Sequence, residues 1–361
     1  MKNSFGSSIT VTLFGESHGA EIGAVIDGLA PGIKVDYDYI NAKLDQRRPY
    51  GKISTARRET DSYRIVSGVY NGYTTGTPIA ILIPNENTKS CDYDTLRDTP
   101  RPSHADYVAE VKYHGFQDAR GGGHFSGRIT AALVAAGAIV NSALQNKGIF
   151  IGTHISSLCS VKDDVITSVD DVHILSNKLF PTLSADAEEK MKEKIEAAGS
   201  EGDSVGGILE SAVFGVPAGV GEPFFDSMES ILSHALFSVP AIKGVEFGAG
   251  FAIADMYGSA ANDPFTVEEG NIVTKTNNSG GINGGITNGM PITFRCAVKP
   301  TPSIYKEQDT VSMSEKTNKK LMIEGRHDPA IIHRVRAVVD AVTALAIADM
   351  LTVRFGTDYL K

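Results

Sequence analysis

Residues 130–145 have the sequence TAALVAAGAIVNSALQ, and residues 337–351 have the sequence AVVDAVTALAIADML. Both stretches are apolar around nearly the whole circumference of an α-helix, which predicts burial on every side rather than on one face. We therefore expect helices over residues 130–145 and 330–354, in a layer that other elements cover. A third predicted helix, residues 184–198, begins with Ser184 as its N-cap and carries a charged, solvated face.

The elements that cover these helices are predicted to be β-strands. Seven segments have β-branched or alternating patterns bounded by Gly, Pro or Asn. They are residues 9–15, 23–29, 63–72, 78–85, 206–217, 244–256 and 291–300. Regular helices do not alternate with them, which disfavours a Rossmann-like parallel sheet. We expect an α+β fold in which helices are sandwiched between antiparallel β-sheets, as a single domain over residues 1–361 with mobile loops near 45–60 and 262–278.

Composition limits the classes of function. The 361 residues are 42% hydrophobic and 21% charged, as in soluble globular proteins, and the net charge of −9 argues against a nucleic-acid-binding surface. Cys91, Cys159 and Cys296 are widely spaced, as expected for reduced thiols. The N-terminus lacks a signal-peptide pattern, and two aspartates interrupt the run 337–351, which falls short of a membrane span. We expect a cytoplasmic protein that binds neither nucleic acid nor membrane.

One region of this acidic chain is strongly basic. From Arg47 to Arg64 the six basic residues exceed the two acidic ones, Glu59 and Asp61, by four charges. Guanidinium groups bind carboxylates and phosphates bidentately, so this density of arginine suits a substrate with several negative charges. A solvated basic face or a subunit contact would give the same pattern, and the residues alone leave these alternatives open.

Histidines and glycines cluster in three places: GESHG at 15–19, RPSHAD at 101–106 and RGGGHFSGR at 120–128. The three consecutive glycines expose backbone N–H groups just before a predicted helix, where an anion is favoured. Histidine at such a turn can act as a general acid near neutral pH. The alternative for His18 is a turn histidine bonded to a nearby carbonyl, and the alternative for His104 is a loop histidine with satisfied hydrogen bonds.

A fourth cluster comprises SGGINGG at 279–285, KPTPS at 299–303 and GRHDP at 325–329. Asp328 could be the N-cap of the last helix, with Pro329 at its first position, and this would not exclude a ligand role.

Familiar nucleotide and metal patterns are absent from the sequence. Gly122 and Gly127 have the spacing of a P-loop, but Arg-Ile follows where Lys-Ser or Lys-Thr is needed. No His-x-x-x-His or Cys-x-x-Cys is present, so no metal is expected. The residues predict an arginine-rich polyanion site with acid–base histidines and glycine loops for a phosphate-bearing ligand. They do not by themselves indicate a flavin.

The order of these clusters resembles the chorismate synthase family. GESHG, RRP…RRE, RPSHADY, RGGGHFSGR, KPTPS and GRHDP follow one another from position 15 to 329. The resemblance implies a layer of helices between antiparallel sheets and an anti-1,4-elimination of phosphate from 5-enolpyruvylshikimate 3-phosphate to give chorismate. It also implies reduced FMN as cofactor, with no net redox change, and a homotetramer.

The resemblance assigns roles to individual residues. His18 would be the acid near the departing phosphate, His104 would protonate or steady the reduced flavin, and Asp328 would assist proton removal. The substrate's phosphate and carboxylates are expected on Arg47, Arg48, Arg57 and Arg128. FMN contacts are expected from His124, Phe125, Ser126, Pro240, Ala241, Gly284, Lys299, Pro300, Thr301, Pro302, Ser303 and Arg326. Arg47 and Lys52 match positions linked to nicotinamide nucleotide (NADP) binding in some members.

The chain departs from the commoner bacterial pattern at two places in the expected flavin site. Many relatives have Arg-Ser-Ser where this chain has residues 124–126, and Asn-Ala where it has Pro240-Ala241. Two other classes of function stay open. A flavin oxidoreductase would consume nicotinamide steadily without a shikimate substrate, and a non-catalytic anion-binding protein would keep its function after His18→Ala.

Overall fold

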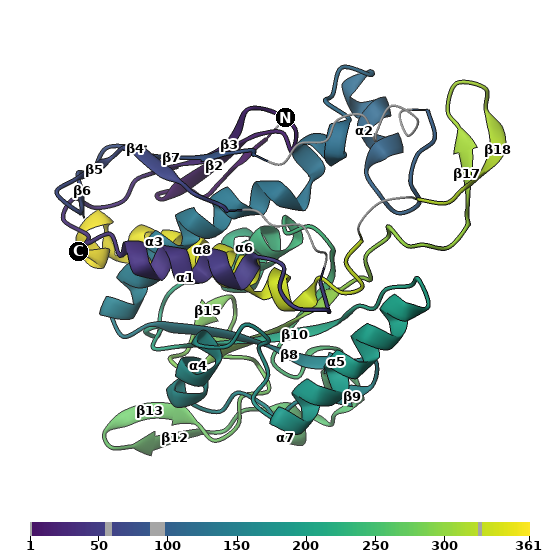
Figure 1. Cartoon of the computed structure of the whole chain (residues 1–361). Helices are drawn as coiled ribbons and strands as arrows, with labels where there is room; N and C mark the ends of the chain where they lie inside the picture. The colour runs from purple at the N-terminus through teal and green to yellow at the C-terminus, as the bar shows by residue number, and fades with distance from the viewer. Residues whose placement is uncertain (1, 55–59, 87–97, 324–326) are drawn as a thin grey trace.

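The computed structural model describes residues 2–54, 60–86, 98–323 and 327–361. It shows a layer of helices between two five-stranded β-sheets (Figure 1), and neighbouring strands in both sheets are antiparallel. At the centre lie α3 (Thr130–Asn146) and α8 (Ile332–Phe355), which contain the two apolar stretches that predicted the layer. The predicted α+β sandwich is confirmed.

The first sheet has the strand order β1-β2-β3-β7-β4 and packs on α3. Its strands are β1 (Ser4–Phe5), β2 (Thr10–Gly15), β3 (Glu21–Asp27), β4 (Arg64–Ser67) and β7 (Ile79–Pro84). Ile79, Ile81 and Ile83 are each no more than 1% exposed, because the period of two in β7 turns every second side chain toward the helices.

The second sheet has the order β11-β16-β10-β8-β9 and contacts α8, while its edge strand β11 packs on α6. Its strands are β8 (Phe150–Leu158), β9 (Val161–Lys162), β10 (Gly207–Phe214), β11 (Ile242–Phe247) and β16 (Ile292–Val298). The sequence did not predict β8, because Thr153 and His154 interrupt its apolar pattern. Both are fully buried and paired, Thr153 with Ser211 and His154 with Asp163, each at 2.8 Å.

The remaining helices are α1 (Tyr37–Arg47), α2 (Asp106–Tyr113), α4 (Val169–Ser176), α5 (Ala185–Ser200), α6 (Met228–Phe237) and the short α7 (Gly258–Ala261). α1 and α6 pack on α8 within the middle layer, and α4 covers the outer side of β8 (Figure 1). Ser184 accepts a hydrogen bond from the Ala187 backbone N–H, so its predicted role as the N-cap of α5 is confirmed.

Small residues allow α3 and α8 to approach closely. A Cβ atom at Gly137 of α3 would lie 2.6 Å from the Cα of Ala341, so a larger residue would force the helices apart. Asp349 of α8 accepts the backbone N–H groups of Ser7, Ser8 and Ile9 at 2.9, 2.7 and 2.8 Å. This aspartate therefore anchors the start of the first sheet to the helix layer.

One helical stretch, Gly127–Asn146, is long and apolar enough to cross a membrane, but 83% of its most apolar window is buried inside the protein. That is the environment of a helix at the centre of a folded core.

The predicted start of the last helix is wrong. α8 begins at Ile332 with Ile331 as N-cap and without a capping side chain, so Asp328 is not the N-cap. Its carboxylate accepts a hydrogen bond from Arg334 instead, at 2.8 Å. The ion pair with Arg334 takes the place of the capping bond.

The predicted long loop at 262–278 contains a hairpin, β12 (Phe265–Glu268) and β13 (Asn271–Thr274). These four-residue strands lie among polar residues, which hide the alternation of apolar and polar side chains. The mobility expected in this segment stays a prediction. So does the mobility near 45–60, of which residues 55–59 lie outside the described part.

Three further hairpins lie in the described part of the chain. The hairpins are β5 (Val69–Tyr70) with β6 (Tyr73–Thr74), β14 (Ile282–Asn283) with β15 (Ile286–Thr287), and β17 (Gln308–Ser312) with β18 (Thr317–Leu321). The expected strand at 244–256 ends early, because a 3-10 turn at Gly250–Asp255 follows β11. Cys159 and Cys296 are free thiols, as predicted, and Cys91 lies outside the described residues.

Candidate active site

Two of the glycine–histidine segments pack against each other beside the N-terminus of α3. The loop 15–19 follows β2, and the segment 120–125 precedes α3. The Ser17 backbone N–H donates to the Gly123 carbonyl at 3.1 Å, and His124 Nδ1 donates to the Gly15 carbonyl at 2.8 Å. His124 is therefore tied to the backbone of the other segment, and it also lines the cavity described below.

Glycine is required at position 121 because the His18 ring lies against it. Gly121 has φ +60°, and a Cβ there would lie 2.5 Å from His18 Nε2 and 2.8 Å from Ser17 Oγ. His18 is only 8% exposed. The glycine run therefore makes room for this imidazole at the wall of a cavity.

That cavity has a volume of about 1220 Å³. His18, His104 and Asp328, the three residues expected to be catalytic, all line it although they lie in distant parts of the sequence. Single-ligand pockets are commonly about 300–1,000 Å³. The cavity can therefore hold two ligands side by side.

Most of the predicted ligand-binding residues line the same cavity. They are Arg47, Arg128, His124, Phe125, Ser126, Pro240, Ala241, Lys299, Thr301, Pro302 and Ser303. Four do not line it: Arg48, Lys52, Gly284 and Pro300. Gly284 lies in the turn between β14 and β15, and Lys52 lines a smaller neighbouring cavity of about 340 Å³. Arg57 and Arg326 lie outside the described residues.

His104 is a neutral imidazole in this setting. Its Nε2 lies 2.8 Å from Ser303 Oγ. Burial, followed by the Arg101 guanidinium, lowers the pKa of His104 to about 4, although the carboxylate of Asp106 opposes the shift. At neutral pH it can hydrogen-bond to a ligand without bringing a charge of its own.

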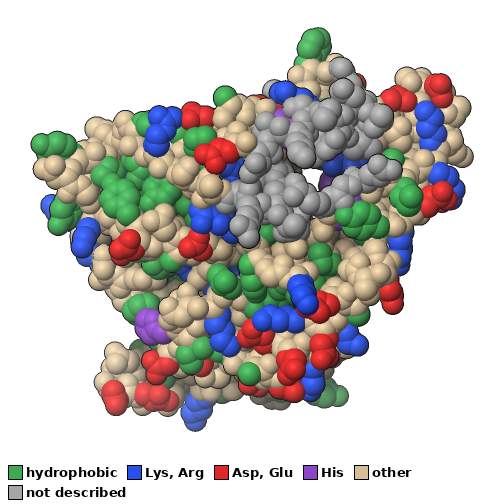
Figure 2. Space-filling view, viewed as in Figure 1, with side chains coloured by type: hydrophobic (Ala, Val, Ile, Leu, Met, Phe, Trp, Pro, Cys, Tyr) green, Lys and Arg blue, Asp and Glu red, His purple; other side chains and the backbone are tan. Residues whose placement is uncertain are grey.

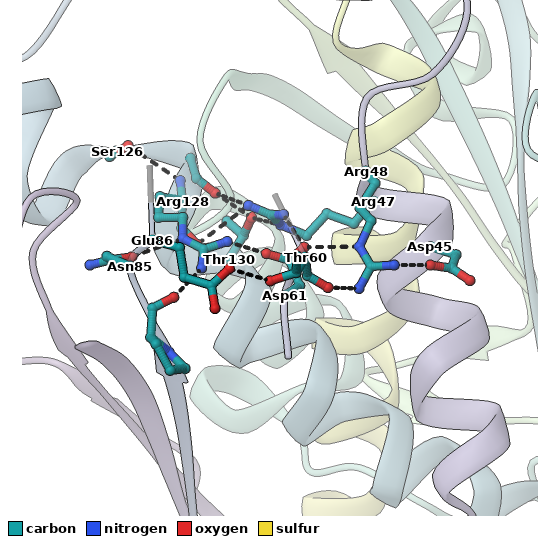
Figure 3. Close-up of polar contacts among 12 residues, drawn as sticks. Asp45, Arg47, Arg48, Thr60, Asp61, Asn85, Glu86, Ser126, Arg128 and Thr130 are labelled. Carbon is teal, nitrogen blue, oxygen red and sulfur yellow. Dashed lines mark hydrogen bonds and ion pairs between the residues drawn. The ribbon is translucent and has the colours of Figure 1, made fainter. Parts of the chain in front are cut away.

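Three arginines converge on the carboxylate of Asp61 beside the cavity (Figure 3). Arg47 Nη1 donates to Asp61 at 3.0 Å, and Arg128 Nη1 donates to its other oxygen. The third, Arg48, has its Nε 3.7 Å from Asp61 and also pairs with Asp45. The basic stretch is thus neither a fully solvated face nor wholly open to a ligand.

Arg334 connects Asp328 to the arginine cluster. Its Nη1 donates to Asp328 Oδ2 at 2.8 Å, and its Nε donates to the carbonyl of Arg47, also at 2.8 Å. Arg334 lines the cavity as well. The sequence carried a signal for this residue that we did not use: a cation in the first turn of a helix is unfavourable unless an acid lies near.

Asp61 was also missed. In the sequence it counted only as a charge that offsets the basic stretch, whereas in the structure its side chain is fully buried between guanidinium groups. An aspartate within a run of arginines is the signal that could have identified it.

The cavity wall formed by residues 299–303 has the features of a binding surface for a phosphate-bearing cofactor. Thr301 Oγ1 is buried with no hydrogen-bond partner among the described residues, and a buried hydroxyl normally has one. Lys299 and Lys243 both line this wall; burial, and then Lys243, lower the pKa of Lys299. An unsatisfied hydroxyl beside two cations fits a polar, anionic ligand such as FMN.

Over the rest of the surface in view, acidic and basic side chains alternate across the described residues and form no extended basic region (Figure 2). Among the described residues, no group of three His, Cys, Asp or Glu side chains is arranged to hold a metal ion.

Comparison with known proteins decides the family. The family model for chorismate synthase matches residues 9–352. Chorismate synthases of Pyrococcus abyssi and Methanosarcina barkeri are 47% and 45% identical to this chain. The chain belongs to the chorismate synthase family. The alignment with the Pyrococcus protein covers 97% of each chain, and that with the Methanosarcina protein covers 96% of this chain and 95% of the relative.

A solved structure described as a crystal structure of chorismate synthase has a TM-score of 0.77 and 28% identity, covering 98% of this chain and 94% of that one. As a chorismate synthase, the chain is a carbon–oxygen lyase of aromatic amino acid biosynthesis. It converts 5-enolpyruvylshikimate 3-phosphate to chorismate by anti-1,4-elimination of phosphate. The family generally depends on a flavin.

Proposed function

We propose that this chorismate synthase uses reduced FMN, bound in the large cavity against the wall of residues 299–303. The observation that carries the proposal is that one cavity gathers the three expected catalytic residues together with Arg47 and Arg128. Pro240-Ala241 and residues 124–126 line the same space and would complete the FMN contacts. When bound, reduced FMN supplies electron density that helps the allylic phosphate to leave.

The arginines and His18 serve the departing phosphate. Arg47 and Arg128 line the cavity, and their guanidinium groups suit the substrate's phosphate and carboxylates, as Arg57 would. The imidazole N–H of His18 donates a proton to the leaving phosphate oxygen. Fixed donors of this kind stabilise developing negative charge in a site from which water is excluded.

Asp328 and His104 act on the ring proton and on the cofactor, respectively. The Asp328 carboxylate is oriented by Arg334 and assists removal of the ring proton. His104 steadies the cofactor as a neutral hydrogen-bonding imidazole, in line with its lowered pKa. The protein thus supplies position and electrostatics around the reacting ring.

The nicotinamide assignment for Arg47 and Lys52 is the second candidate function. Lys52 lines the smaller cavity, and Ser303, His327 and Asp328 line both cavities, so the two spaces are neighbours. A nicotinamide held there would lie near the flavin wall and would allow the enzyme to reduce its own cofactor.

We also propose a cytoplasmic homotetramer. Phe225 and Tyr257 are 92% and 87% exposed, and Phe224 and Phe251 are each 85% exposed, which supports self-association through these regions. Sedimentation of the purified chain tests the tetramer.

An anaerobic assay with photoreduced FMN and 5-enolpyruvylshikimate 3-phosphate tests the cofactor and the roles of the residues. We expect chorismate and free phosphate in equal amounts, without net oxidation of the flavin. His18→Ala should retain substrate binding and lose most of the turnover. Product formation with oxidised FMN alone would overturn the cofactor proposal, and full turnover in the His18 variant would overturn the proposed acid.

Steady NADPH consumption by enzyme and FMN, without the shikimate substrate, would show that the chain reduces its own flavin. The Lys52→Ala variant should then raise the KM for NADPH.

A further inference from the structure

The side chain of Asp61 is completely buried, and its two oxygens are divided between two guanidinium groups (Figure 3). Oδ2 accepts from Arg47 Nη1 at 3.0 Å, and Oδ1 accepts from Arg128 Nη1. One carboxylate therefore bridges the C-terminal end of α1 and the N-terminal side of α3.

Asp61 contacts the guanidinium groups without lining the cavity itself. Arg47 and Arg128 both line the cavity, whereas Asp61 does not. A carboxylate that competes with substrate for the arginines would have to stand on the cavity side. Because Asp61 does not line the cavity, its place is that of a support for the two arginines.

Other acceptors complete this support. Arg47 Nε donates to Thr130 Oγ1 at 3.1 Å, and Arg128 Nε donates to Asn85 Oδ1 at 2.9 Å. Planar guanidinium groups held through several N–H groups keep a defined orientation. The two arginines are thus preorganised before any ligand arrives.

Electrostatics explains why an acid is needed at position 61. The side chains of Arg47 and Arg128 are 4% and 5% exposed, so two cations that repel each other are nearly buried together. Burial would raise the pKa of Asp61, but Arg47 and Arg128 outweigh burial and hold that pKa below its ordinary value. Asp61 also has φ +48°, in the left-handed region that aspartate tolerates better than most L-residues.

We propose that Asp61 is a positioning residue for the elimination: it holds Arg47 and Arg128 side by side, facing the cavity, so that they can receive the phosphate and carboxylate groups of the substrate. The inference rests on the proposed role of these arginines in substrate binding. Asp61 itself does not touch the substrate.

The test is Asp61→Asn, which keeps the shape and removes the charge. We expect the KM for 5-enolpyruvylshikimate 3-phosphate to rise roughly 10- to 100-fold, since loss of a hydrogen bond to a charged group changes a binding constant by about this factor. The kcat and the Kd for FMN should change less than about threefold. Asp45→Asn is the matched control, because it removes an exposed partner of Arg48 from the same cluster and should leave the KM unchanged.

Three results would overturn the proposal. A lower KM, or tighter binding of inorganic phosphate, would show that Asp61 competes with anions. Equal loss of FMN and substrate binding would show a general structural role, and an unchanged KM would show no role.

Thr130→Val keeps the proposal testable if Asp61→Asn does not fold. It removes the acceptor of Arg47 Nε without removing a charge, and we expect a smaller rise in KM, roughly threefold to tenfold, with FMN binding retained. An unchanged KM here would contradict the positioning role. If Arg47→Ala and Arg128→Ala themselves leave the KM unchanged, the proposed substrate site fails, which is a separate outcome.

Discussion

Arg334 Nη1 lies 2.8 Å from Oδ2 of Asp328, and the same guanidinium donates through Nε to the carbonyl of Arg47. A single side chain of α8 therefore joins the carboxylate proposed for proton removal to the end of α1, which carries the arginine proposed for substrate binding.

Arg334→Gln should lower kcat more than it raises the KM. Loss of a hydrogen bond to a charged group costs about 1.5–3 kcal/mol, which corresponds to roughly 10- to 150-fold in rate. Steady-state kinetics under anaerobic conditions measures the changes in kcat and KM separately. Arg354→Gln is the control, because Arg354 lies at the other end of α8 and donates to the Gly219 carbonyl. An unchanged kcat for Arg334→Gln would mean that Asp328 does not depend on this contact.

Gly121→Ala should behave like a variant of His18. The new methyl group would overlap the imidazole and displace it, and loss of a general acid costs roughly 10²- to 10⁴-fold in kcat. Gly148→Ala is the matched control: Gly148 also has a positive φ, but no atom lies within 4 Å of an added Cβ. If both variants lose the same activity, backbone strain rather than the position of His18 is responsible.

Arg48→Ala should weaken substrate binding less than Arg47→Ala does. Arg47 lines the cavity and Arg48 does not. We expect about 1.5–3 kcal/mol for Arg47 and less than about 1 kcal/mol for Arg48, whose side chain is 30% exposed and paired with Asp45. Equilibrium binding of the substrate, with FMN as the reference ligand, measures both. Equal losses would place Arg48 against the substrate and contradict the geometry.

His333 should make the protein less stable in acid. It is fully buried, its Nε2 lies 2.9 Å from Ser54 Oγ, and burial, then Arg334 and Lys192, lower the pKa of His333 to about 3. The unfolded chain takes up this proton near pH 6.5 while the folded chain resists it. The free energy of unfolding therefore falls between about pH 6.5 and pH 3, by at most about 1.4 kcal/mol per pH unit.

Urea unfolding of His333→Gln checks this, because the glutamine amide can replace Nε2 as the partner of Ser54. The variant should lose less stability than the wild type when the pH is lowered from 7 to 4. Parallel pH curves would show that His333 does not titrate on unfolding.

His154 should have the opposite pH dependence. Its Nδ1 lies 2.8 Å from Asp163 and its Nε2 3.4 Å from Glu210. Burial lowers the pKa of His154, but hydrogen bonds to Asp163 and Glu210 outweigh burial and raise it above 6.5. The stabilisation is therefore complete below about pH 6.5 and is lost as the pH rises through the folded-state pKa.

The difference in unfolding free energy between the wild type and His154→Gln measures the contribution of His154. It should be larger at pH 6 than at pH 9. A difference that is equal at both pH values would contradict the ion-pair interpretation.

The helix layer could be predicted because its signal is local. Residues 130–145 and 337–351 are apolar on every side. A helix of this kind must be buried, whichever other elements bury it. β8 could not be predicted in this way, because Thr153 and His154 become acceptable inside the sheet only through partners in β10 and after β9. The local rule for helix starts predicted Asp328 as the N-cap of the last helix. In the structure, the Asp328 carboxylate is paired with Arg334 instead.

The same distinction between local and tertiary signals holds for the candidate site. The sequence by itself determined the family, the reaction and the residue types available: imidazoles among glycines, arginines in a cluster, and an acid before the last helix. Only the tertiary structure decided which of these residues share a cavity, that Arg48 does not line it, and that Asp61 and Arg334 contact the arginines and Asp328. The physical reason is the distance along the chain over which each interaction acts. Hydrophobic periodicity and glycine turns act within a few residues, whereas the orientation of a buried charge depends on counter-charges that packing brings from elsewhere in the chain.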